Sequence, residues 1–348
     1  MRRKTKSKTL KNSLILGGCV VVIGLLLWFL IGRAPFLYPW QGETDAIKAF
    51  SGVYEPSAAQ QLNDGKLIVL EDEVSRALNL LRFGAKGQLN EDAILDKQLN
   101  AQLDERLDDL EGIAIGQKGE VYATTSFSRT RKGKRRTNRE KLVRLVFDEN
   151  GQLVKQNVYK HFAKSLNKSG LFSTLNANNE GRSIALSALN IEGLSFDADK
   201  QQLLFGLKKP LVNDLSVIIY LNNPEQVLDG TEEPLLAKEA TLLDLQGGGI
   251  RSLCYVKKLQ GYLIANEVDY GGGPKQSQLW FWQGADHQPV ALTLPEIAEM
   301  ENIEAVSPVI INGKAKVLVM SDDGSRRKKQ PAHYSVIEYN SIQSQLSH

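Results

Sequence analysis

One short pattern recurs along this chain, and it constrains the fold more than any other feature. An apolar residue, a glutamate, a small residue and another apolar residue open a strand, and a tight turn connects it to a second strand. The glutamate place falls at residues 55, 111, 192, 251 (an arginine) and 304, at intervals of 53 to 81 residues. Such intervals are typical of a four-stranded propeller blade with its loops. The five copies therefore predict a closed ring of five blades, or six if the longest interval holds another.

The remaining sequence is also mostly β. Short apolar and β-branched runs alternate with turns such as Asn63-Asp64-Gly65 and Asn312-Gly313. Only residues 92–110, which are acid-rich with leucines at four-residue spacing, predict a helix, and residues 163–188 and 224–241 are expected to be loops or insertions. The alternative fold is a β-sandwich whose strands resemble one another by chance. The expected strands include Lys66–Leu70, Leu142–Phe147, Gln202–Leu207, Leu215–Tyr220, Tyr262–Asn266, Gln278–Trp282, Ala315–Met320 and Ser335–Tyr339.

Composition permits a large core and argues against nucleic acid as a partner. The 348 residues are 42% hydrophobic and 24% charged, which excludes disordered and collagen-like chains. The formal charge of +3 includes seven Lys/Arg and no acid in residues 1–33, so the remainder holds 36 Lys/Arg against 40 Asp/Glu. Because this remainder is mildly acidic, no whole-surface attraction to nucleic acid is expected.

The N-terminal segment is expected to be a transmembrane helix. Basic residues 1–13 precede the apolar run Leu14–Ile31, which as a helix spans about 27 Å, close to the ~30 Å hydrocarbon core. The basic end should stay cytoplasmic, with the lipid bilayer of the inner membrane as a partner and the propeller on its periplasmic or extracellular side. A cleaved signal peptide and lipidation at Cys19 are the alternatives. The expected domains are a cytoplasmic segment 1–13, a signal-anchor helix 14–32, a linker 33–50, a propeller 51–341 and a tail 342–348.

The repeated acidic place suggests a site at the mouth of the channel. The first strand of each blade lines the channel, so equivalent residues of successive blades should form a ring there. Facing carboxylates repel unless they are protonated, paired or bridged by a cation, and Ca²⁺ accepts 6–8 such oxygens. In the alternative, each glutamate only caps backbone amides or pairs with Lys/Arg in its own blade. The expected Ca²⁺ ligands are Glu55, Asp72, Glu111, Glu192, Glu304, Asp322 and Asp323.

A basic run is the second candidate site. Arg129–Arg139 holds seven Lys/Arg in eleven residues, and Arg326–Lys329 forms a second basic run. Each run could be a solvated loop, or it could bind an anionic small molecule or protein partner. The expected ligand-binding residues are Ser126, Ser128, Arg129, Arg131, Lys132 and Lys208.

The chain resembles an exported bacterial family known as domain of unknown function 3616, over about residues 55–339. The resemblance implies a relative of the phytase-like and esterase-like β-propellers and supplies no established activity. Lys208 stands where the family is expected to have arginine, which weakens the case for a bidentate anion contact. The motifs that carry the resemblance are Leu70-Glu71-Asp72-Glu73, Leu110-Glu111-Gly112-Ile113, residues 126–136, Asn190-Ile191-Glu192-Gly193-Leu194, residues 206–211, Gly249-Ile250-Arg251 and Ser321-Asp322-Asp323-Gly324.

Common catalytic motifs are missing from the sequence. It has no Gly-x-Ser-x-Gly, no His-Glu-x-x-His and no Cys-x-x-Cys. An enzyme on this scaffold is expected to be a Ca²⁺-assisted phosphoric-ester hydrolase with Glu111, Glu192 and Arg251 as catalytic residues. The alternative is a non-catalytic propeller that binds an anionic ligand or a partner protein at the channel mouth.

Overall fold

Four-stranded antiparallel sheets make up most of the described chain. The computed structural model describes residues 46–72, 76–180, 183–268, 275–284 and 286–346, and residues 45–348 form one unit. Its described part holds five such sheets. From the inner to the outer strand they are β2 (Pro56–Gln61), β3 (Leu67–Glu71), β4 (Leu78–Phe83) and β5 (Leu89–Glu91); β6 (Leu110–Ile115), β7 (Val121–Thr125), β8 (Leu142–Phe147) and β9 (Leu153–Tyr159); β10 (Asn190–Asp197), β11 (Gln202–Val212), β12 (Leu215–Leu221) and β13 (Thr241–Leu243); β14 (Ile250–Val256), β15 (Gly261–Val268), β16 (Gln276–Trp282) and β17 (Val290–Leu292); and β18 (Ile303–Ile311), β19 (Lys314–Ser321), β20 (His333–Glu338) and β1 (Ile47–Ala49).

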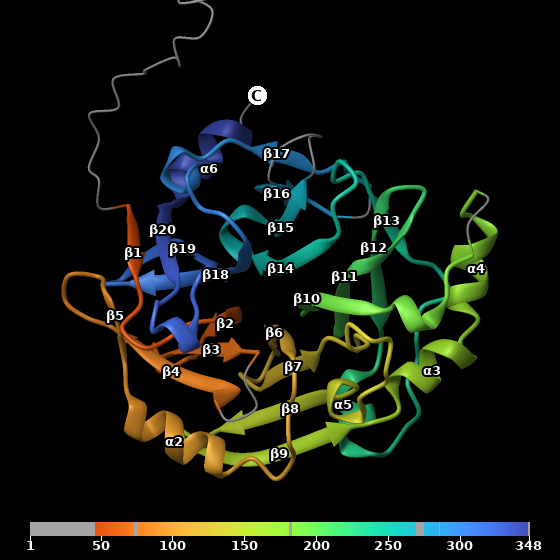
Figure 1. Cartoon of the computed structure of the whole chain (residues 1–348), viewed down its shortest axis with the longest axis horizontal. Coiled ribbons are helices and arrows are strands. Elements are labelled where there is room, and N and C mark those ends of the chain that lie inside the picture. The colour runs from red at the N-terminus through yellow and green to blue at the C-terminus, as the bar shows by residue number, and fades with distance from the viewer. Residues whose placement is uncertain (1–45, 73–75, 181–182, 269–274, 285, 347–348) are drawn as a thin grey trace, which may run out of the picture. The chain divides into compact units, whose positions relative to one another are not determined.

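The sheets are arranged around a common centre (Figure 1). Inner strand β2 contacts β6, β6 contacts β10, β10 contacts β14, β14 contacts β18, and β18 returns to β2. A hydrophobic cluster fills the space between each pair of neighbouring sheets. This closed ring confirms the predicted all-β propeller architecture and rules out the two-layer sandwich.

The two ends of the unit meet in one sheet. Strand β1 is the outer strand of the sheet that also holds β18, β19 and β20, with Ile47 opposite Ser335 and Ala49 opposite His333. The backbone hydrogen bonds between β1 and β20 therefore close the ring, and the ends cannot separate without breaking a sheet.

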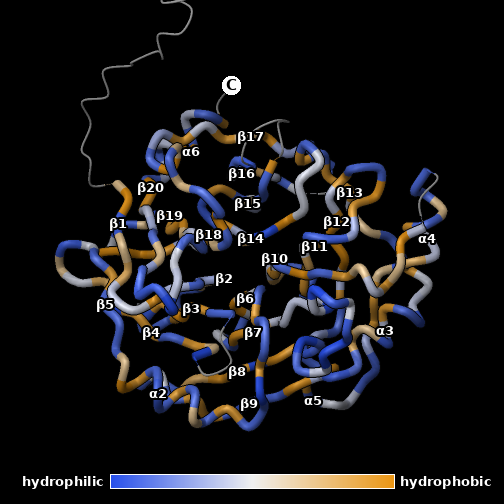
Figure 2. Tube along the Cα trace, viewed as in Figure 1, coloured by the Kyte–Doolittle hydropathy of each residue, from blue (hydrophilic) through white to orange (hydrophobic). Residues whose placement is uncertain are grey.

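Burial on both faces explains why many strands read as continuous apolar runs. Each sheet packs against a neighbour on both sides, so β3 (LIVLE) is buried along its whole length, and most of β12 (LSVIIYL) is buried as well. A strand with a single covered face would instead alternate apolar and polar residues. Figure 2 shows hydrophobic residues concentrated along the strands and hydrophilic residues in many of the connections.

The helices lie outside the ring of inner strands (Figure 1). The helix predicted over 92–110 is confirmed only for its first half, where Asp92 accepts backbone hydrogen bonds from Ile94 and Leu95 and caps α2. The expectation of loops over 163–188 and 224–241 is wrong in part, because Leu166, Leu171 and other apolar side chains there are buried on short helices. The helices are α2 (Ala93–Ala101), α3 (Phe162–Lys168), α4 (Leu171–Ala177), α5 (Pro224–Asp229), α6 (Tyr339–Leu346) and the 3-10 turns η2 (Thr137–Arg139), η3 (Leu186–Ala188), η4 (Lys257–Leu259), η5 (Pro295–Ile297) and η6 (Arg326–Lys328).

The propeller begins earlier and ends later in the chain than the predicted bounds of 51 and 341. Strand β1 lies within the range assigned to a linker, and Phe50 is buried in the core. Residues 342–346, assigned to a tail, continue α6, and Ile342 is fully buried. Within the described ranges no helix is long and apolar enough to cross a membrane. The predicted anchor Leu14–Ile31 lies outside the described residues.

The inner strands pack so closely that little space remains between them. A Cβ atom on Gly112 would lie 2.7 Å from the Leu194 Cβ, and one on Gly193 would lie 2.8 Å from the Ile250 Cγ2. Both distances are too short for packed carbon atoms, so glycine is required at these two places. A small cavity of about 10 Å³ lies among the inner strands, with Glu192 and Leu194 in its wall.

Candidate functional site

Each inner strand carries a β-bulge near its beginning. The pairing with the second strand shifts by one residue between Leu110 and Gly112, and equivalent shifts occur in the other four sheets. A bulge leaves one residue unpaired and redirects its side chain. The residues at the bulges are Ser57, Glu111, Glu192, Arg251 and Glu304.

The bulges explain the repeat seen in the sequence and correct one of its members. Glu55 was predicted to occupy the repeated place in the first sheet, but the register puts Ser57 there, two residues later. The Ser57 hydroxyl donates a hydrogen bond to the Leu110 carbonyl oxygen over 2.6 Å. The ring at this end of the propeller, named the charged end below, therefore holds three glutamates, one arginine and one serine.

Arg251 lies at the centre of the charged end and links three sheets. Its guanidinium pairs with Glu304, lies 3.6 Å from a Glu267 carboxylate oxygen and 4.0 Å from one of Glu192, and donates to the Asn302 side chain. The Arg251 side chain is only 9% exposed. Arg251 was predicted to be catalytic. Its contacts with three carboxylates give it a structural role, because they join neighbouring sheets.

Two cations lie beside Glu192, Lys208 at one carboxylate oxygen and Arg251 at 4.0 Å from the other. Its Oε1 accepts a hydrogen bond from Lys208 Nζ over 2.6 Å and one from Asn190 over 3.1 Å. Its Oε2 is buried and has no hydrogen-bond partner among the described residues. Lys208, predicted to bind a ligand, is therefore paired with Glu192 in this structure.

Glu111 has neither an ion pair nor a hydrogen bond with any described residue, although it lies near several acids. Burial, followed by the charges of Glu192, Glu304 and Asp109, raises the pKa of Glu111 well above its usual range. Burial also raises the pKa of Glu304 to about 8, even though Arg251 acts in the opposite direction. Both shifts favour the protonated form of the carboxyl group, which makes Glu111 and Glu304 candidate acids.

A second acidic group lies beside this ring. Asp109 directly precedes β6 and accepts hydrogen bonds from the hydroxyls of Ser126 and Ser128, while Arg139 Nη1 lies 2.8 Å from its carboxylate. Asp109 and Phe127 both have positive φ, 65° and 59°. Such strained backbone is unusual for residues other than glycine, and it is often found at functional sites.

Asp72 completes this group by hydrogen bonding to Asp109. Although the Asp72 side chain is exposed, its surroundings remove enough hydration, together with the charge and hydrogen bond of Asp109, to raise the pKa of Asp72 to about 8. Asp72 therefore keeps its proton near neutral pH and donates it to Asp109 in a hydrogen bond. Sequence reasoning named Asp72, Ser126 and Ser128 but missed Asp109 and Arg139. The signal that could have found Asp109 is its place immediately before the repeated strand.

The basic run divides into paired and unpaired cations. Arg135 forms a two-point ion pair with Glu140, and Arg136 and Arg139 lie 3.2 and 3.5 Å from Asp108. The predicted ligand-binding residues Arg129, Arg131 and Lys132 lie on an exposed turn between β7 and β8, without an ion pair to any described residue. This connection and the start of β6 lie at the same end of their sheet, so these cations border the charged end.

The remaining predicted metal ligands have other partners. Asp323 lies 2.7 Å from His333 Nδ1, and burial and Glu55 raise the pKa of Asp322 to about 6. Arg326 of the second basic run packs 4.6 Å from the Tyr54 ring centre and pairs with buried Glu71 over 3.0 Å. Over the described ranges, no three His, Cys, Asp or Glu residues are grouped to hold a metal ion.

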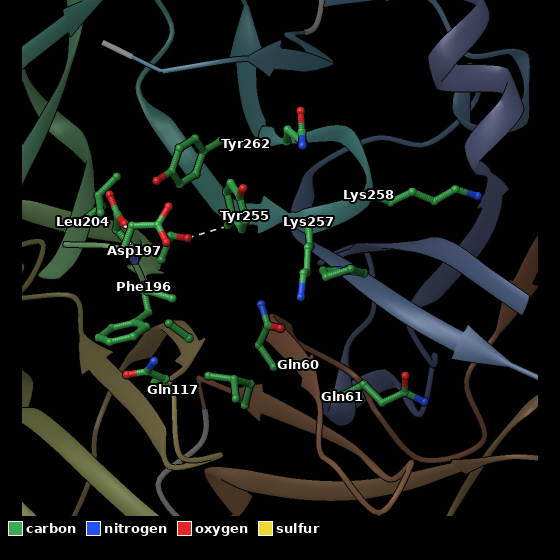
Figure 3. A pocket seen from close by; sticks show the side chains of 18 of the residues that line it. Gln60, Gln61, Gln117, Phe196, Asp197, Leu204, Tyr255, Lys257, Lys258 and Tyr262 are labelled. Carbon is green, nitrogen blue, oxygen red and sulfur yellow. Dashed lines mark hydrogen bonds between the residues drawn. The ribbon is translucent and has the colours of Figure 1, made fainter. Parts of the chain in front are cut away.

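A large cavity lies at the opposite end of the ring, where the hairpin turns join inner to second strands (Figure 3). Its volume is about 1400 Å³. Side chains of Gln60, Phe196, Asp197, Tyr255 and Lys257 are among its walls. No sequence motif indicated this cavity, because its walls come from five separate hairpins that only the closed ring brings together.

Comparisons with known proteins identify similar folds only. No family model matches the chain, and no curated protein matches it. Among solved structures, an α-L-arabinofuranosidase from Clostridium thermocellum is 11% identical over 82% of this chain and 90% of that chain, with a TM-score of 0.47. A GH43 β-1,3-galactosidase is 10% identical over 83% and 94% of the two chains (TM-score 0.44). The PQQ-bound aldose sugar dehydrogenase from Streptomyces coelicolor is 15% identical over 83% and 98% (TM-score 0.38). These similarities lie in the arrangement of strands and say nothing of this chain's substrate.

Proposed function

We propose that this chain is a five-bladed β-propeller hydrolase whose active site is the charged end, and that it works by general acid–base chemistry between paired carboxyl groups. The observation that carries the proposal is the Asp72–Asp109 pair. Asp72 is exposed, donates a hydrogen bond to Asp109 and has a pKa of about 8. A protonated carboxyl group that is hydrogen-bonded to a second carboxyl group can donate its proton near neutral pH and take it back afterwards.

The roles of the two aspartates follow from their surroundings. The hydroxyls of Ser126 and Ser128 donate hydrogen bonds to Asp109, and Arg139 lies 2.8 Å from its carboxylate. Asp72, whose pKa is raised, carries the proton and gives it to the leaving oxygen as the bond to that oxygen breaks. A water molecule attacks the atom that loses the leaving oxygen. The water then gives a proton to the two carboxyl groups, which restores the protonated Asp72.

The charge of the site supports an uncharged polar substrate. Glu111 has no ion pair with any residue in the described ranges, and Arg251, Lys208 and Arg139 are already engaged by carboxylates. A phosphate dianion would be repelled by the remaining acids unless a cation came with it. The Ca²⁺-assisted phosphoric-ester hydrolase predicted from sequence needs such a cation, and the described acids are not grouped to hold one. Hydroxyl-rich substrates with glycosidic or ester bonds suit the site better.

One observation favours the non-catalytic alternative. Arg129, Arg131 and Lys132 stand exposed at the rim of the charged end without acidic partners among the described residues. Exposed cations of this kind can attract an anionic ligand or an acidic protein surface. In that function the carboxyl groups inside the rim would serve stability alone.

The test is a hydrolysis assay of the full-length chain with nitrophenyl glycosides, nitrophenyl carboxylic esters and a nitrophenyl phosphate, each in EDTA and in Ca²⁺. We expect metal-independent turnover of an uncharged substrate, a rate that falls as pH rises through about 8, and a loss of about 100-fold or more in Asp72→Asn. The control is Glu149→Gln, on the exposed turn between β8 and β9. Failure to hydrolyse any of these substrates, or an unchanged rate in Asp72→Asn, would overturn the proposal. Turnover of the phosphate in Ca²⁺ alone would support the sequence-based prediction instead.

A further inference from the structure

The cavity at the turn end is separate from the charged end. The ends of the inner strands and the hairpin turns line it, whereas the charged residues stand at the beginnings of the same strands. Between them the inner strands close around a space of only about 10 Å³. A ligand in one place therefore does not reach the other, and the two ends can have different functions.

Several polar side chains in the cavity have no hydrogen-bond partner among the described residues. Gln60 is half-buried at the end of β2, and Tyr255 and Tyr262 face the cavity from β14 and β15. In Figure 3 these three residues lie around one opening, with the Lys257 amine directed toward the Gln60 amide. Side-chain amides and phenols in folded proteins usually form hydrogen bonds. Their unused donors and acceptors are therefore available to a ligand.

An aromatic row lies on one wall. The ring centres of Tyr255 and Tyr262 are 5.2 Å apart, and those of Tyr262 and Trp282 are 5.0 Å apart. Tyr255 is 41% exposed at the outer end of the row, and Ile310 is 61% exposed elsewhere on the cavity rim. A fixed aromatic face that is open to water is suited to stack against the C–H face of a flat ligand.

The charges of the wall balance, so the cavity is not specialised for an ion. Tyr255 and Gln60 lie among three acids and three lysines. Lys258 is already placed 4.8 Å from the Tyr339 ring centre. The wall thus offers amides, phenols and an aromatic face with little net charge. The three acids and three lysines of the wall are Asp64, Asp197, Asp199, Lys200, Lys257 and Lys258.

The rim is braced before any ligand arrives. Gln61 Nε2 donates to the Ile310 carbonyl over 3.1 Å and Gln61 Oε1 accepts from the Ile310 amide over 2.6 Å, which joins the first sheet to the last. Gln201 donates to Gln117 over 2.7 Å and joins two further sheets. A preformed rim lowers the entropy that binding must overcome.

We propose that this cavity binds a neutral oligosaccharide of several sugar rings. Neighbouring hydroxyls of a sugar can pair with the donor and acceptor of one side-chain amide such as Gln60, and the ring face can stack on Tyr255. The volume of about 1400 Å³ exceeds the 300–1,000 Å³ typical of small-molecule sites, which favours an oligomer. An extended peptide is less suited, because such peptides usually pair with a free strand edge, and here strand ends and turns form the walls.

The experiment measures binding rather than turnover, so its result is independent of the proposed hydrolase. Isothermal titration calorimetry of the full-length chain would use cellohexaose, maltohexaose, mannohexaose and chitohexaose as probes, with a neutral hexapeptide beside them. We expect at least one hexasaccharide to bind, and Tyr255→Ala and Gln60→Ala to weaken it about tenfold. Tyr255→Phe keeps the stacking face and should lose less than Tyr255→Ala.

Two controls keep the result interpretable. Gln88→Ala changes an exposed glutamine on the β4–β5 turn and should bind as the unmodified chain does. Circular dichroism of each variant identifies any that fails to fold, and Tyr255→Phe then takes the place of Tyr255→Ala. The proposal is overturned if no hexasaccharide binds, if only the peptide binds, or if folded Tyr255 and Gln60 variants bind as tightly as Gln88→Ala.

Discussion

Replacing Arg251 by methionine should destabilise the propeller strongly, and more so at high pH. The substitution keeps most of the side-chain volume but removes the cation between Glu304, Glu192 and Glu267. Removing one partner of a buried ion pair typically costs about 3–5 kcal/mol, because the remaining charge has no compensation. For a unit of about 300 residues this corresponds to a fall of roughly 5–8 °C in the melting midpoint.

The pH dependence follows from Glu304. Its pKa rises from 4.5 to about 8 on folding, so the stability linked to its bound proton is complete below pH 4.5 and is lost as pH rises through 8. At pH 6 the carboxyl group is largely protonated, so it carries little charge for Arg251 to neutralise and the loss of stability on removing Arg251 is small. At pH 9 Glu304 is ionised in the unmodified chain; without Arg251 its carboxyl group must stay charged without a partner or take up a proton, and a loss of up to about 3–5 kcal/mol is expected there.

The assay is thermal unfolding of the full-length chain at pH 6 and pH 9, followed by circular dichroism. The matched control is Lys118→Met, because Lys118 forms an exposed ion pair with Glu225 over 2.6 Å and should change the midpoint by less than about 1 °C. The double variant Arg251→Met/Glu304→Gln removes the orphaned carboxylate and should regain part of the loss at pH 9. An equal loss at both pH values, or no recovery in the double variant, would refute the reasoning.

Three further predictions concern packing, the proton on Asp72 and metal. Gly193→Ala should destabilise the chain by about 1–3 kcal/mol, because the new Cβ would lie 2.8 Å from the Ile250 Cγ2; an unchanged urea midpoint would contradict the close packing of the inner strands. In ¹³C NMR the Asp72 carboxyl should titrate near pH 8, and its pKa should fall toward the ordinary value of 3.8 in Asp109→Asn. A titration midpoint near 4 in the unmodified chain would contradict a protonated Asp72 at neutral pH. Millimolar Ca²⁺ in place of EDTA should leave the melting midpoint unchanged, since the described acids are not grouped around an ion; a rise equivalent to about 2.7 kcal/mol, as for a ligand at a hundredfold excess over its Kd, would restore the predicted metal ring.

Much of the architecture was predictable because its signals are local. Apolar runs between Gly, Asn and Asp turns predict strands without knowledge of their partners, and Leu142–Phe147 matches β8 in full. The repeat of glutamate before a small residue marked the bulged inner strands, since the bulge and the close packing at Gly112 and Gly193 impose the same residue types in successive sheets. The short helices α3 and α4 were missed, because their apolar residues are buried only by contact with neighbouring sheets.

The sequence by itself therefore determined the strands, the ring and the acidic character of one end. Only the tertiary structure decided which charges meet. The register of β2 and β3 put Ser57 rather than Glu55 in the ring, and the packing of neighbouring sheets joined Arg251 to Glu304 and Asp72 to Asp109. The cavity at the turn end depends on tertiary structure entirely, because five separate hairpins meet there. The physical reason is range: hydrophobic patterning and turns act within a few residues, whereas electrostatic pairing and cavities depend on residues that only closure of the ring brings together.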